Sequence, residues 1–404
     1  MADDAELVIA GAGLTGLLLA LACAGAGLPV ALVDREDPAA MQSEAFDGRS
    51  SAIAKGSQQV LAALGLWAEI APEAEPILEI RVADDDSPLF LHYDHRELGR
   101  GEPLGYIVEN RVLRRVLLAH ARALPSLEFL ARRTVAAVEA GPAAATVRLS
   151  DGGSLRTRLV AAADGQRSRL RAAAGIKTVE WRYPQTAIVA TVRHERPHGG
   201  IAVEHFLPAG PFAILPMTER RSSIVWTEEA ALAPRLLALP EAEFAAELQA
   251  RFGDFLGAVE PVGPRSSYPL ALMQAERYCA PRLALVGEAA HLIHPIAGQG
   301  LNLGIRDVAA LAELAIDARR LGLDIGAEGV LRDYQRWRRA DAVLLAAVTD
   351  GLNRLFSNSL PPLKLARDLG LAAVDRMPPL KRLFMRHAMG TLGDLPRLAR
   401  GRPL

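Results

Sequence analysis

The stretch LVIAGAGLTG, residues 7–16, decides the fold of this chain. Its first part, Leu7–Ala10, is apolar and uncharged, as in a strand that is buried on both faces. The three glycines that follow have the spacing Gly-x-Gly-x-x-Gly and lead into an apolar run with the length of a helix. Gly11 permits a sharp turn, Gly13 lets the backbone approach a pyrophosphate, and Gly16 lets the helix pack closely on the strand. The stretch therefore predicts the start of a βαβ unit.

A second strand is predicted at Pro29–Val33, and it ends at Asp34. A carboxylate about 20 residues after the glycine turn can accept hydrogen bonds from ribose hydroxyls. Arg35 leaves an alternative open, because an arginine there can pair with the extra phosphate of NADP, although it can also be a solvated surface charge. Strand, turn, helix, strand and terminal acid together predict a dinucleotide site.

The same region could be mistaken for a membrane span, because about 20 apolar residues cross a bilayer and Leu7–Val33 carries no charge. Glycines and Pro29 interrupt it, and acidic residues precede it, so a buried strand–helix–strand unit is the better interpretation. With 404 residues, 50% of them apolar, the chain can form two domains. The formal charge of −1 gives no overall attraction to nucleic acid, and we expect no nucleic-acid partner. Cys23 and Cys279 lack metal-like spacing, which indicates reduced thiols and a cytoplasmic protein.

Two later segments carry more specific patterns. Residues 160–171 read VAAADGQRSRLR, and residues 282–307 read RLALVGEAAHLIHPIAGQGLNLGIRD. Both resemble signatures of the FAD-dependent aromatic hydroxylases. In the second segment a strand ends at a glycine and an acid, and Gly298 to Gly300 opens a helix whose free amides can face the pyrimidine edge of the flavin. That edge becomes anionic on reduction, so the helix would stabilise the reduced flavin.

The resemblance assigns candidate residues to the cofactor and to the active site. Glu288 departs from the family, which usually has Asp or Asn there, so a longer carboxylate must make the same contact. Two arginines match family positions near FAD, where a guanidinium can bind phosphate in a forked geometry, with a surface charge as the alternative for each. The cofactor-binding residues are expected to be Gly11, Gly13, Gly16, Asp34, Arg49, Arg111, Asp164, Gly287, Glu288, Gly300, Leu301 and Asn302. The loop that lines the flavin face is expected to contain His294, Pro295, Gly298 and Gln299, and no side chain is assigned as acid or base. His291 and His294 lie three residues apart, but no third ligand is apparent, so no metal is expected.

Shorter runs narrow the resemblance to the ubiquinone-biosynthesis hydroxylases. These runs are DGRSSAIA at 47–54, LAALGLW at 61–67, GPFAILPM at 210–217, SIVW at 223–226 and HPIAGQG at 294–300. In that family reduced FAD reacts with O2 to form a flavin C4a-hydroperoxide, whose terminal oxygen passes to the ring of a prenylated phenol. The resemblance implies FAD, O2 and either NAD(P)H or a protein electron carrier as reductant, with other ubiquinone-biosynthesis proteins as partners. Two alternatives stay open: a hydroxylase of a small soluble aromatic acid, and a flavin-binding assembly subunit without turnover.

The expected fold class is α/β, with a Rossmann-like FAD-binding domain similar to that of para-hydroxybenzoate hydroxylase, an inserted β-sheet substrate domain and a helical C-terminal segment. Short β-rich runs with Gly and Pro punctuation indicate the sheet. An amphipathic helix is expected at Glu241–Phe252, with Phe244, Leu248 and Phe252 on one face. The predicted division is 1–75, 100–175 and 277–350 for the FAD-binding domain, 76–99 and 176–276 for the substrate domain, and 351–404 for the C-terminal segment.

Charge is uneven at the end of the chain. Between Pro361 and Leu404 nine basic residues face three acidic ones, a formal charge of +6 against −7 for the remainder. An apolar helical pattern of Leu380, Leu383, Phe384 and Ala388 runs beside Lys381, Arg382 and Arg386. Such a pattern is typical of a helix that lies on an anionic membrane, here the inner face of the membrane, and equally of a basic tail packed on the protein.

Overall fold

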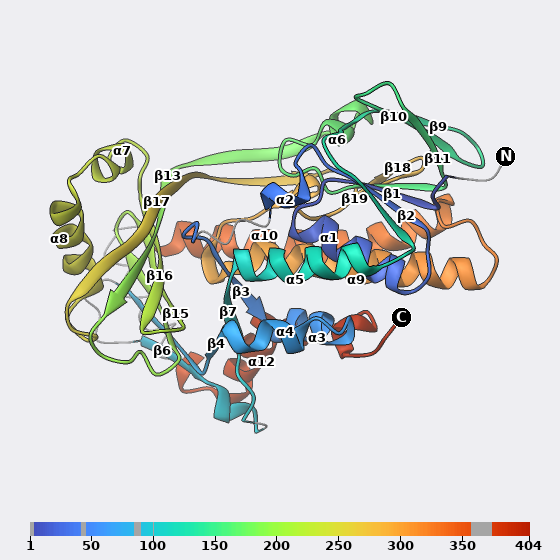
Figure 1. Ribbon diagram of the computed structural model, residues 1–404. Helices are drawn as coiled ribbons and strands as arrows, with labels where there is room; N and C mark the ends of the chain where they lie inside the picture. The colour runs from blue at the N-terminus through green and yellow to red at the C-terminus, as the bar shows by residue number, and fades with distance from the viewer. Residues whose placement is uncertain (1–3, 42–45, 85–89, 100, 357–373) are drawn as a thin grey trace.

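The computed structural model describes residues 4–41, 46–84, 90–99, 101–356 and 374–404. Two large sheets organise them (Figure 1). The six-stranded sheet has the order β18-β19-β12-β1-β2-β8, and the eight-stranded sheet has the order β20-β17-β13-β16-β15-β14-β5-β6. The strands of the six-stranded sheet are β1 Leu7–Ala10, β2 Val30–Val33, β8 Leu127–Leu130, β12 Leu159–Ala162, β18 Cys279–Ala280 and β19 Leu283–Leu285. Those of the eight-stranded sheet are β5 Glu79–Asp84, β6 Phe90–Asp94, β13 Thr178–His194, β14 Ile201–Leu207, β15 Gly210–Met217, β16 Arg221–Glu229, β17 Val259–Ala275 and β20 His291–Leu292.

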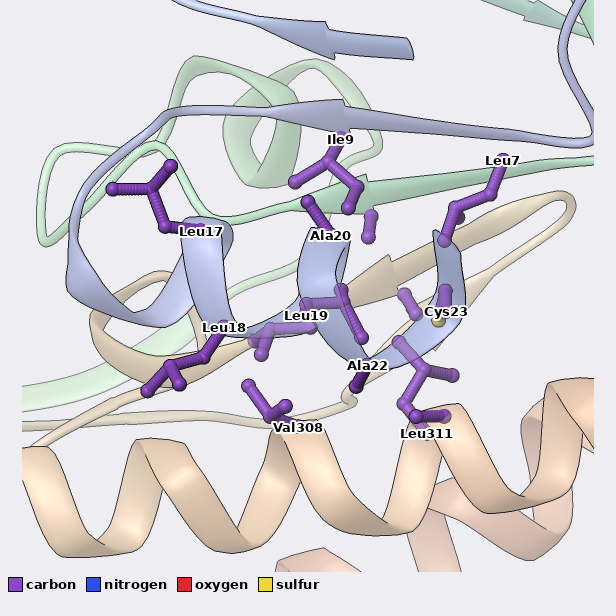
Figure 2. Packing of buried hydrophobic residues seen from close by; sticks show 14 of the residues in the cluster. Leu7, Ile9, Leu17, Leu18, Leu19, Ala20, Ala22, Cys23, Val308 and Leu311 are labelled. Carbon is purple, nitrogen blue, oxygen red and sulfur yellow. The ribbon is translucent and has the colours of Figure 1, made fainter. Parts of the chain in front are cut away.

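The six-stranded sheet forms because its central strands are apolar on both faces. β1 pairs in parallel with β2 on one side and with β12 on the other. All four residues of each of these three strands are buried, which explains why their sequences show no alternation of polar and apolar side chains. Helices therefore cover the sheet. α1, Leu14–Gly25, lies between β1 and α9, Gln299–Arg320, where Leu18 and Leu19 approach Val308 (Figure 2).

The remaining elements pack around these two sheets (Figure 1). Two small sheets are β3-β7-β4 and β11-β10-β9. Their strands are β3 Ser50–Ala54, β4 Ala74–Ile77, β7 Gly105–Glu109, β9 Val135–Ala140, β10 Ala145–Leu149 and β11 Ser154–Thr157. The other helices are α2 Pro38–Met41, α3 Lys55–Ala63, α4 Trp67–Ile70, α5 Asn110–Ala123, α6 Arg169–Ala173, α7 Ala233–Leu237, α8 Glu241–Phe252, α10 Glu328–Phe356 and α12 Pro378–Ala388. Short 3-10 turns are η1 Ala71–Glu73, η2 His95–Leu98, η3 Gly287–Ala289, η4 Ile296–Gly298 and η5 Leu398–Arg400.

The eight-stranded sheet connects the two halves of the molecule. Its longest strands, β13 and β17, have 17 residues each and pair with one another along most of their length. One face of the sheet is covered by α7 and α8, and the expected helix is confirmed with Phe244, Leu248 and Phe252 buried. The other face packs on η4 and α10, where Phe206 contacts a cluster that includes Ile296 and Phe356. This second face therefore looks toward the loop that follows β20.

The fold class expected from the sequence is confirmed. α10 is continuous through residue 350, where the sequence-based division ends the FAD-binding domain. The C-terminal segment packs against the rest of the protein: Leu398 and Ala399 belong to the main core, and Met385 is 2% exposed.

One expectation about α12 is wrong. Lys381 does not lie on an exposed basic flank, because it is 6% exposed and its Nζ binds Glu97 at 2.8 Å and Asp375 at 3.1 Å. These two carboxylates keep the ammonium charged in a buried position, since they supply the attraction that offsets its lost hydration. The buried side of α12 thus holds Lys381 and Met385, and Leu383 and Phe384 are exposed.

Candidate active site

The glycine turn after β1 has the geometry that its spacing predicts. Gly11 has φ +104°, and a Cβ there would overlap the carbonyl oxygen of Ala163 at the end of β12. A Cβ at Gly16 would overlap the carbonyl oxygen of Gly11. Nothing lies within 4 Å of the position that a Cβ of Gly13 would take. Two glycines therefore allow close backbone packing, and the middle one leaves open space in front of the N-terminus of α1.

Asp34 lies beside this turn. Its Oδ2 accepts a hydrogen bond from the amide of Ala12 at 2.5 Å, and its Oδ1 accepts one from the amide of Glu36 at 2.7 Å. The carboxylate thus connects the end of β2 to the turn and remains partly exposed. Arg35 is exposed, and its Nε lies 4.0 Å from Oε1 of Glu36. A carboxylate held at this place suits the ribose contact that the sequence assigned to it.

Asp164 follows β12 and reaches the same region. Its Oδ2 accepts a hydrogen bond from the amide of Arg169 at 2.9 Å, at the start of α6. Its Oδ1 is buried and has no hydrogen-bond partner within the described residues. A buried carboxylate oxygen without a donor is costly, because the lost water contacts are not replaced. A hydroxyl donor, such as those of a ribityl chain, would satisfy this oxygen.

The segment that follows β19 packs against the glycine turn and α1 at Gly287. This residue has φ +62°, and a Cβ there would lie 3.1 Å from the side chain of Thr15 on α1. Its amide donates to Oδ2 of Asp307 at 3.0 Å. Glu288 follows with an exposed side chain, so the longer acid lies at the surface of the site. Segments from residues 11, 164 and 287 consequently meet at one end of the six-stranded sheet.

The loop after β20 carries the residues predicted to line the flavin. His294 is 0% exposed, and neither ring nitrogen has a hydrogen-bond partner within the described residues. Its ring packs edge-on against Tyr183, with 5.1 Å between centroids. Burial lowers the pKa of His294 to about 4, so the ring is neutral at pH 7. Pro295 is half-buried, and the Nε2 of Gln299 donates to the carbonyl of Ala388 at 3.4 Å.

Gly298 ends this loop and begins α9. It has φ +60° and ψ 33°, and no side chain caps the first turn of the helix. The free amides of that turn, including the exposed Gly300 and half-buried Leu301, can face an anion. Asn302 has a different contact set: its Oδ1 accepts from the amide of Ala54 at 2.8 Å, and its Nδ2 donates to the carbonyls of Ala52 and Gly298. Asn302 therefore holds the loop against β3.

The two arginines proposed for phosphate binding have partners in the chain. The guanidinium of Arg49 donates to Asp47, and that of Arg111 donates to Glu109 at 2.5 Å. Glu109 also accepts from the buried Arg221 at 2.8 Å. Both predicted arginines lie near the start of α5, but carboxylates already orient them.

The sequence did not predict a buried ion network behind the loop from His294 to Gln299, which we call the flavin loop after its predicted role. Asp307, 0% exposed, accepts from Nε2 of His291 at 2.6 Å and from Nε of Arg338 at 2.8 Å. Burial alone would raise the pKa of Asp307, but the nearby charges of His291 and Arg338 lower it below its usual value. Arg338 also binds Asp341. The conspicuous sequence run at residues 282–307 includes Asp307 and could have drawn attention to this acid. Its partner Arg338 lies on α10, so no local pattern reveals the pair.

The described residues contain one cluster with metal-like spacing, Glu79, His92 and Asp94, whose ligand atoms lie within 4.8 Å of one another. Arg81 and His92 both bind Glu79, and Arg96 binds Asp94 through both carboxylate oxygens. His291 and His294, considered from the sequence, do not converge on a shared ligand set in the described chain: the first binds Asp307 and the second packs on Tyr183.

Comparison with known proteins agrees with this geometry. Residues 4–342 match the family model described as FAD binding domain. The chain is 55% identical over 403 residues to the ubiquinone hydroxylase UbiL of Rhodospirillum rubrum, covering 99% of this chain and 94% of that protein. It is 35% identical over 387 residues to the 3-demethoxyubiquinol 3-hydroxylase of Escherichia coli K12, covering 95% and 98%. The crystal structure of p-nitrophenol 4-monooxygenase PnpA from Pseudomonas putida superposes with a TM-score of 0.79 at 22% identity, covering 96% and 99%.

The fold and the cofactor segments define an FAD-dependent monooxygenase of the aromatic hydroxylase class. Within that class the chain belongs to the family of ubiquinone-biosynthesis hydroxylases. Its cofactor is FAD, with O2 as co-substrate and a nicotinamide-type reductant as is typical of the class.

Proposed function

We propose that this protein hydroxylates the aromatic ring of a prenylated phenol intermediate in ubiquinone biosynthesis. The observation that carries the proposal is that the flavin loop leaves β20 at the edge of the eight-stranded sheet and faces an apolar side of that sheet. A relative of 55% identity is named a ubiquinone hydroxylase. An apolar sheet face beside the cofactor suits a ring with a hydrocarbon tail, because its burial is driven by the apolar area removed from water.

The residues of the three segments would hold FAD. We propose that Gly11, Gly13 and Gly16 receive the pyrophosphate and that Asp34 binds the adenosine ribose, with Arg49 and Arg111 near the phosphates. Asp164, Gly287 and Glu288 would bind the ribityl chain and phosphates. Gly298, Gly300 and Leu301 would face the pyrimidine edge, and Asn302 would hold their loop. When bound, FAD supplies the transfer of electrons to O2 and of one oxygen atom to the ring.

The protein's own contribution is orientation and exclusion of water. The neutral, buried His294 and the half-buried Pro295 would exclude water beside the flavin face. The arginine on the inner face of β16, Arg221, is bound by Glu109, so its charge is already neutralised. This arrangement favours an uncharged phenol over a small aromatic acid, which needs a basic partner for its carboxylate. The reductant, NAD(P)H or a protein carrier, would dock transiently.

The proposed function is tested by single turnover. FAD-loaded protein is reduced with dithionite and mixed with O2 and a short-tailed prenylated phenol, and hydroxylated product is counted per flavin. Product formation from the phenol, and none from 4-hydroxybenzoate, is expected. Product from 4-hydroxybenzoate alone would favour the small-acid hydroxylase, and reoxidation of the flavin without any product would favour a non-catalytic flavoprotein.

Asp34→Ala is expected to weaken FAD binding. The substitution removes the carboxylate that we assign to the ribose and also removes the acceptor for the amide of Ala12. Leaving such donors without a partner costs about 1–3 kcal/mol. Titration of the apoprotein with FAD, followed by quenching of flavin fluorescence, measures the change in Kd. Glu36→Gln is the matched control, because it removes a neighbouring exposed acid whose side chain lies 4.0 Å from Arg35. Equal affinity of Asp34→Ala and wild type would exclude the ribose assignment.

We further propose that α12 contacts an anionic membrane surface. Its exposed side carries Leu383 and Phe384, which are 50% and 43% exposed, beside the exposed Arg382 and Arg386. Apolar side chains flanked by arginines suit the interface of an anionic bilayer. None of the helices in the described part of the chain has both the length and the apolar composition needed to cross a bilayer. Peripheral contact would bring the site close to a substrate whose tail stays in lipid.

The double substitution Leu383→Asp with Phe384→Asp is expected to lower binding to phosphatidylglycerol-containing liposomes, because it removes the inserted apolar surface. Arg382→Gln with Arg386→Gln should weaken the free energy of liposome binding by about 2 kcal/mol at low salt, given about 1 kcal/mol for each basic residue. Cosedimentation measures both. Leu321→Asp, at an apolar residue that is 74% exposed beyond α9, is the control. Truncation after Asn358 is unsuitable, because it would also remove the core residues Met385 and Leu398. Unchanged binding of both double variants would refute membrane contact through α12.

A further inference from the structure

Glu204 is a single acid in the middle of an apolar row of the eight-stranded sheet. On β14 it lies opposite Val82 of β5 and Ala213 of β15. The same register continues to Leu91 on β6 and to Val225 on β16. Residues opposite one another in a sheet share a face. Across these five strands, the row therefore has one carboxylate and four apolar side chains.

The row faces the flavin loop. Side chains alternate along a strand, so Glu204 shares its face with Ala202 and Phe206. Phe206 packs in the cluster that contains Ile296 of the loop and Phe356 of α10. Ala202 packs in a cluster that contains Met385 of α12. The alternate residues Val203 and Leu207 pack instead on the opposite side, under α7 and α8. Glu204 thus lies between two apolar clusters, on the face of the sheet that packs on η4 and α10 and where we place the substrate.

Among the residues that the structure describes, the carboxylate of Glu204 has no partner that explains its position. Within the described residues it makes no hydrogen bond or ion pair, although it remains partly accessible. Burial raises the pKa of Glu204 to about 7. The titratable groups on the same side include Asp84 of β5, Tyr93 of β6, Arg221 of β16, His294 of the loop and Lys381 of α12, and Arg221 is bound by Glu109. Asp84 has an interaction of its own, and Lys381 binds two acids.

We propose that Glu204 is a catalytic base of the hydroxylation, which accepts a hydrogen bond from the ring hydroxyl of the phenol and takes up its proton during oxygen transfer. This inference rests on the proposed function. The phenol O–H bond breaks, an O–H bond forms on the Glu204 carboxylate, and the electron pair stays on the ring oxygen. The ring carbons ortho and para to that oxygen become richer in electrons and accept the oxygen atom more readily. Glu204 returns to its carboxylate form when the product oxygen regains the proton.

The chemistry of the residue fits this role. A general base works best when its pKa lies near the operating pH, because it is then ionised and still takes a proton readily. An isolated carboxylate in an apolar row is unfavourable for folding, since burial costs hydration that no partner replaces. A phenol hydroxyl would supply the missing donor. The four apolar neighbours would at the same time contact the ring and its tail.

Glu204→Gln tests the base. It keeps the size of the side chain and removes the charge, and product per flavin in single turnover is expected to fall by about 100-fold, as general base catalysis contributes that much or more. Flavin reoxidation should continue, so the variant is uncoupled. In the wild type the product yield should rise with pH and reach half its maximum near pH 7, and this step should be absent in Glu204→Gln. Glu229→Gln, an exposed acid at the end of β16, is the control.

A phenol made more acidic by ring fluorination should rescue the variant. It is already ionised near neutral pH, so it no longer needs the protein to take up its proton. Rescue of Glu204→Gln by at least tenfold relative to the unfluorinated phenol is expected, with little change in wild type. Equal product yields, equal pH profiles and no selective rescue would overturn the proposal.

Binding separates this inference from the proposed function. At pH 8 the oxidised FAD form of the wild type should bind the phenol about tenfold more tightly than its methyl ether, which has no hydroxyl to donate. Glu204→Leu, which fits the apolar row and has no acceptor, should lose that preference. If wild type forms no product but the preference exists and is lost in Glu204→Leu, the proposed function fails and the hydroxyl contact stands. If product forms and neither variant differs from wild type, the proposed function stands and Glu204 is not its base.

The pH dependence of stability provides a control for the folding of Glu204→Gln. Because the pKa of Glu204 is higher in the folded protein than in a free side chain, the folded state binds more protons between about pH 4.5 and 7. Wild-type stability from this group therefore falls as pH rises through that window. Glu204→Gln should have a thermal midpoint at pH 8 equal to or above that of wild type, so that loss of product cannot be attributed to unfolding.

Discussion

Asp307→Ala is expected to destabilise the protein by about 3–5 kcal/mol, because it removes one partner of a buried ion pair and leaves the other charge uncompensated. The carboxylate is fully buried and accepts from His291, Arg338 and the amide of Gly287. Chemical denaturation of the apoprotein, followed by tryptophan fluorescence, measures the change in the free energy of unfolding. FAD affinity should fall as well, because the amide of Gly287 loses the acceptor that positions it.

The isosteric variant Asp307→Asn provides the control. It retains size and one good acceptor but loses the charge, so an intermediate loss of stability is expected. The pKa of Asp307 is lowered in the folded protein, and its contribution is therefore present above the unfolded value near pH 4 and lost as pH falls further. The difference between wild type and Asp307→Asn should shrink on acidification below about pH 4. A loss of under about 1 kcal/mol for Asp307→Ala at pH 7 would contradict a stabilising role of the network.

Gly298→Val is expected to remove hydroxylation almost completely. Gly298 has φ +60°, a region that a β-branched residue avoids, and its Cβ would lie 2.8 Å from the Cβ of Ala52. The loop must therefore move away from β3 at the position where we place the flavin face. A displacement of about 1 Å at an active site can cost about 100-fold in rate. Single-turnover product per flavin, compared with the rate of flavin reoxidation, measures the loss of coupling.

Gly322→Val separates backbone strain from the active-site effect. Gly322 follows the other end of α9 with φ +71°, and a Cβ there meets nothing within 4 Å. Both valine variants should lose stability, because both force a left-handed backbone on a branched residue, and Gly298→Val should lose more through its contact with Ala52. Only Gly298→Val should lose coupling. Full product yield in Gly298→Val would remove the loop from the active site.

The parts of this protein that the sequence predicts well are those in which neighbouring residues determine geometry. The strand, turn and helix at residues 7–25 follow from local apolar character and glycine spacing, and the structure has them almost residue for residue. The same is true of the start of α9 at Gly298. The assignments of individual residues to FAD remain predictions, and several, such as Arg49 and Arg111, have carboxylate partners that their sequence spacing alone did not reveal.

The parts that the sequence does not predict depend on contacts between distant residues. Arg338 meets Asp307 because α10 crosses α9, and no local pattern encodes that crossing. The sequence alone presents Lys381 as a surface charge, because its partner Glu97 lies 284 positions away in the chain. Glu204 is one acid in a β-rich run, and its isolation appears only when the register of β5, β14 and β15 is known.

The strand order has a consequence for synthesis on the ribosome. β1 pairs with β12, and β12 pairs with β19, so the nucleotide-binding sheet is complete only when residue 285 has left the exit tunnel. The eight-stranded sheet similarly waits for β17, which ends at residue 275. At about 5–20 residues per second, the apolar strand β1 waits roughly 8–30 seconds after its own synthesis for its neighbour β12. Nascent chains of intermediate length should therefore be strong clients of chaperones, and the segment around Gly287 that we assign to the flavin can join the sheet only after β19 has been synthesised.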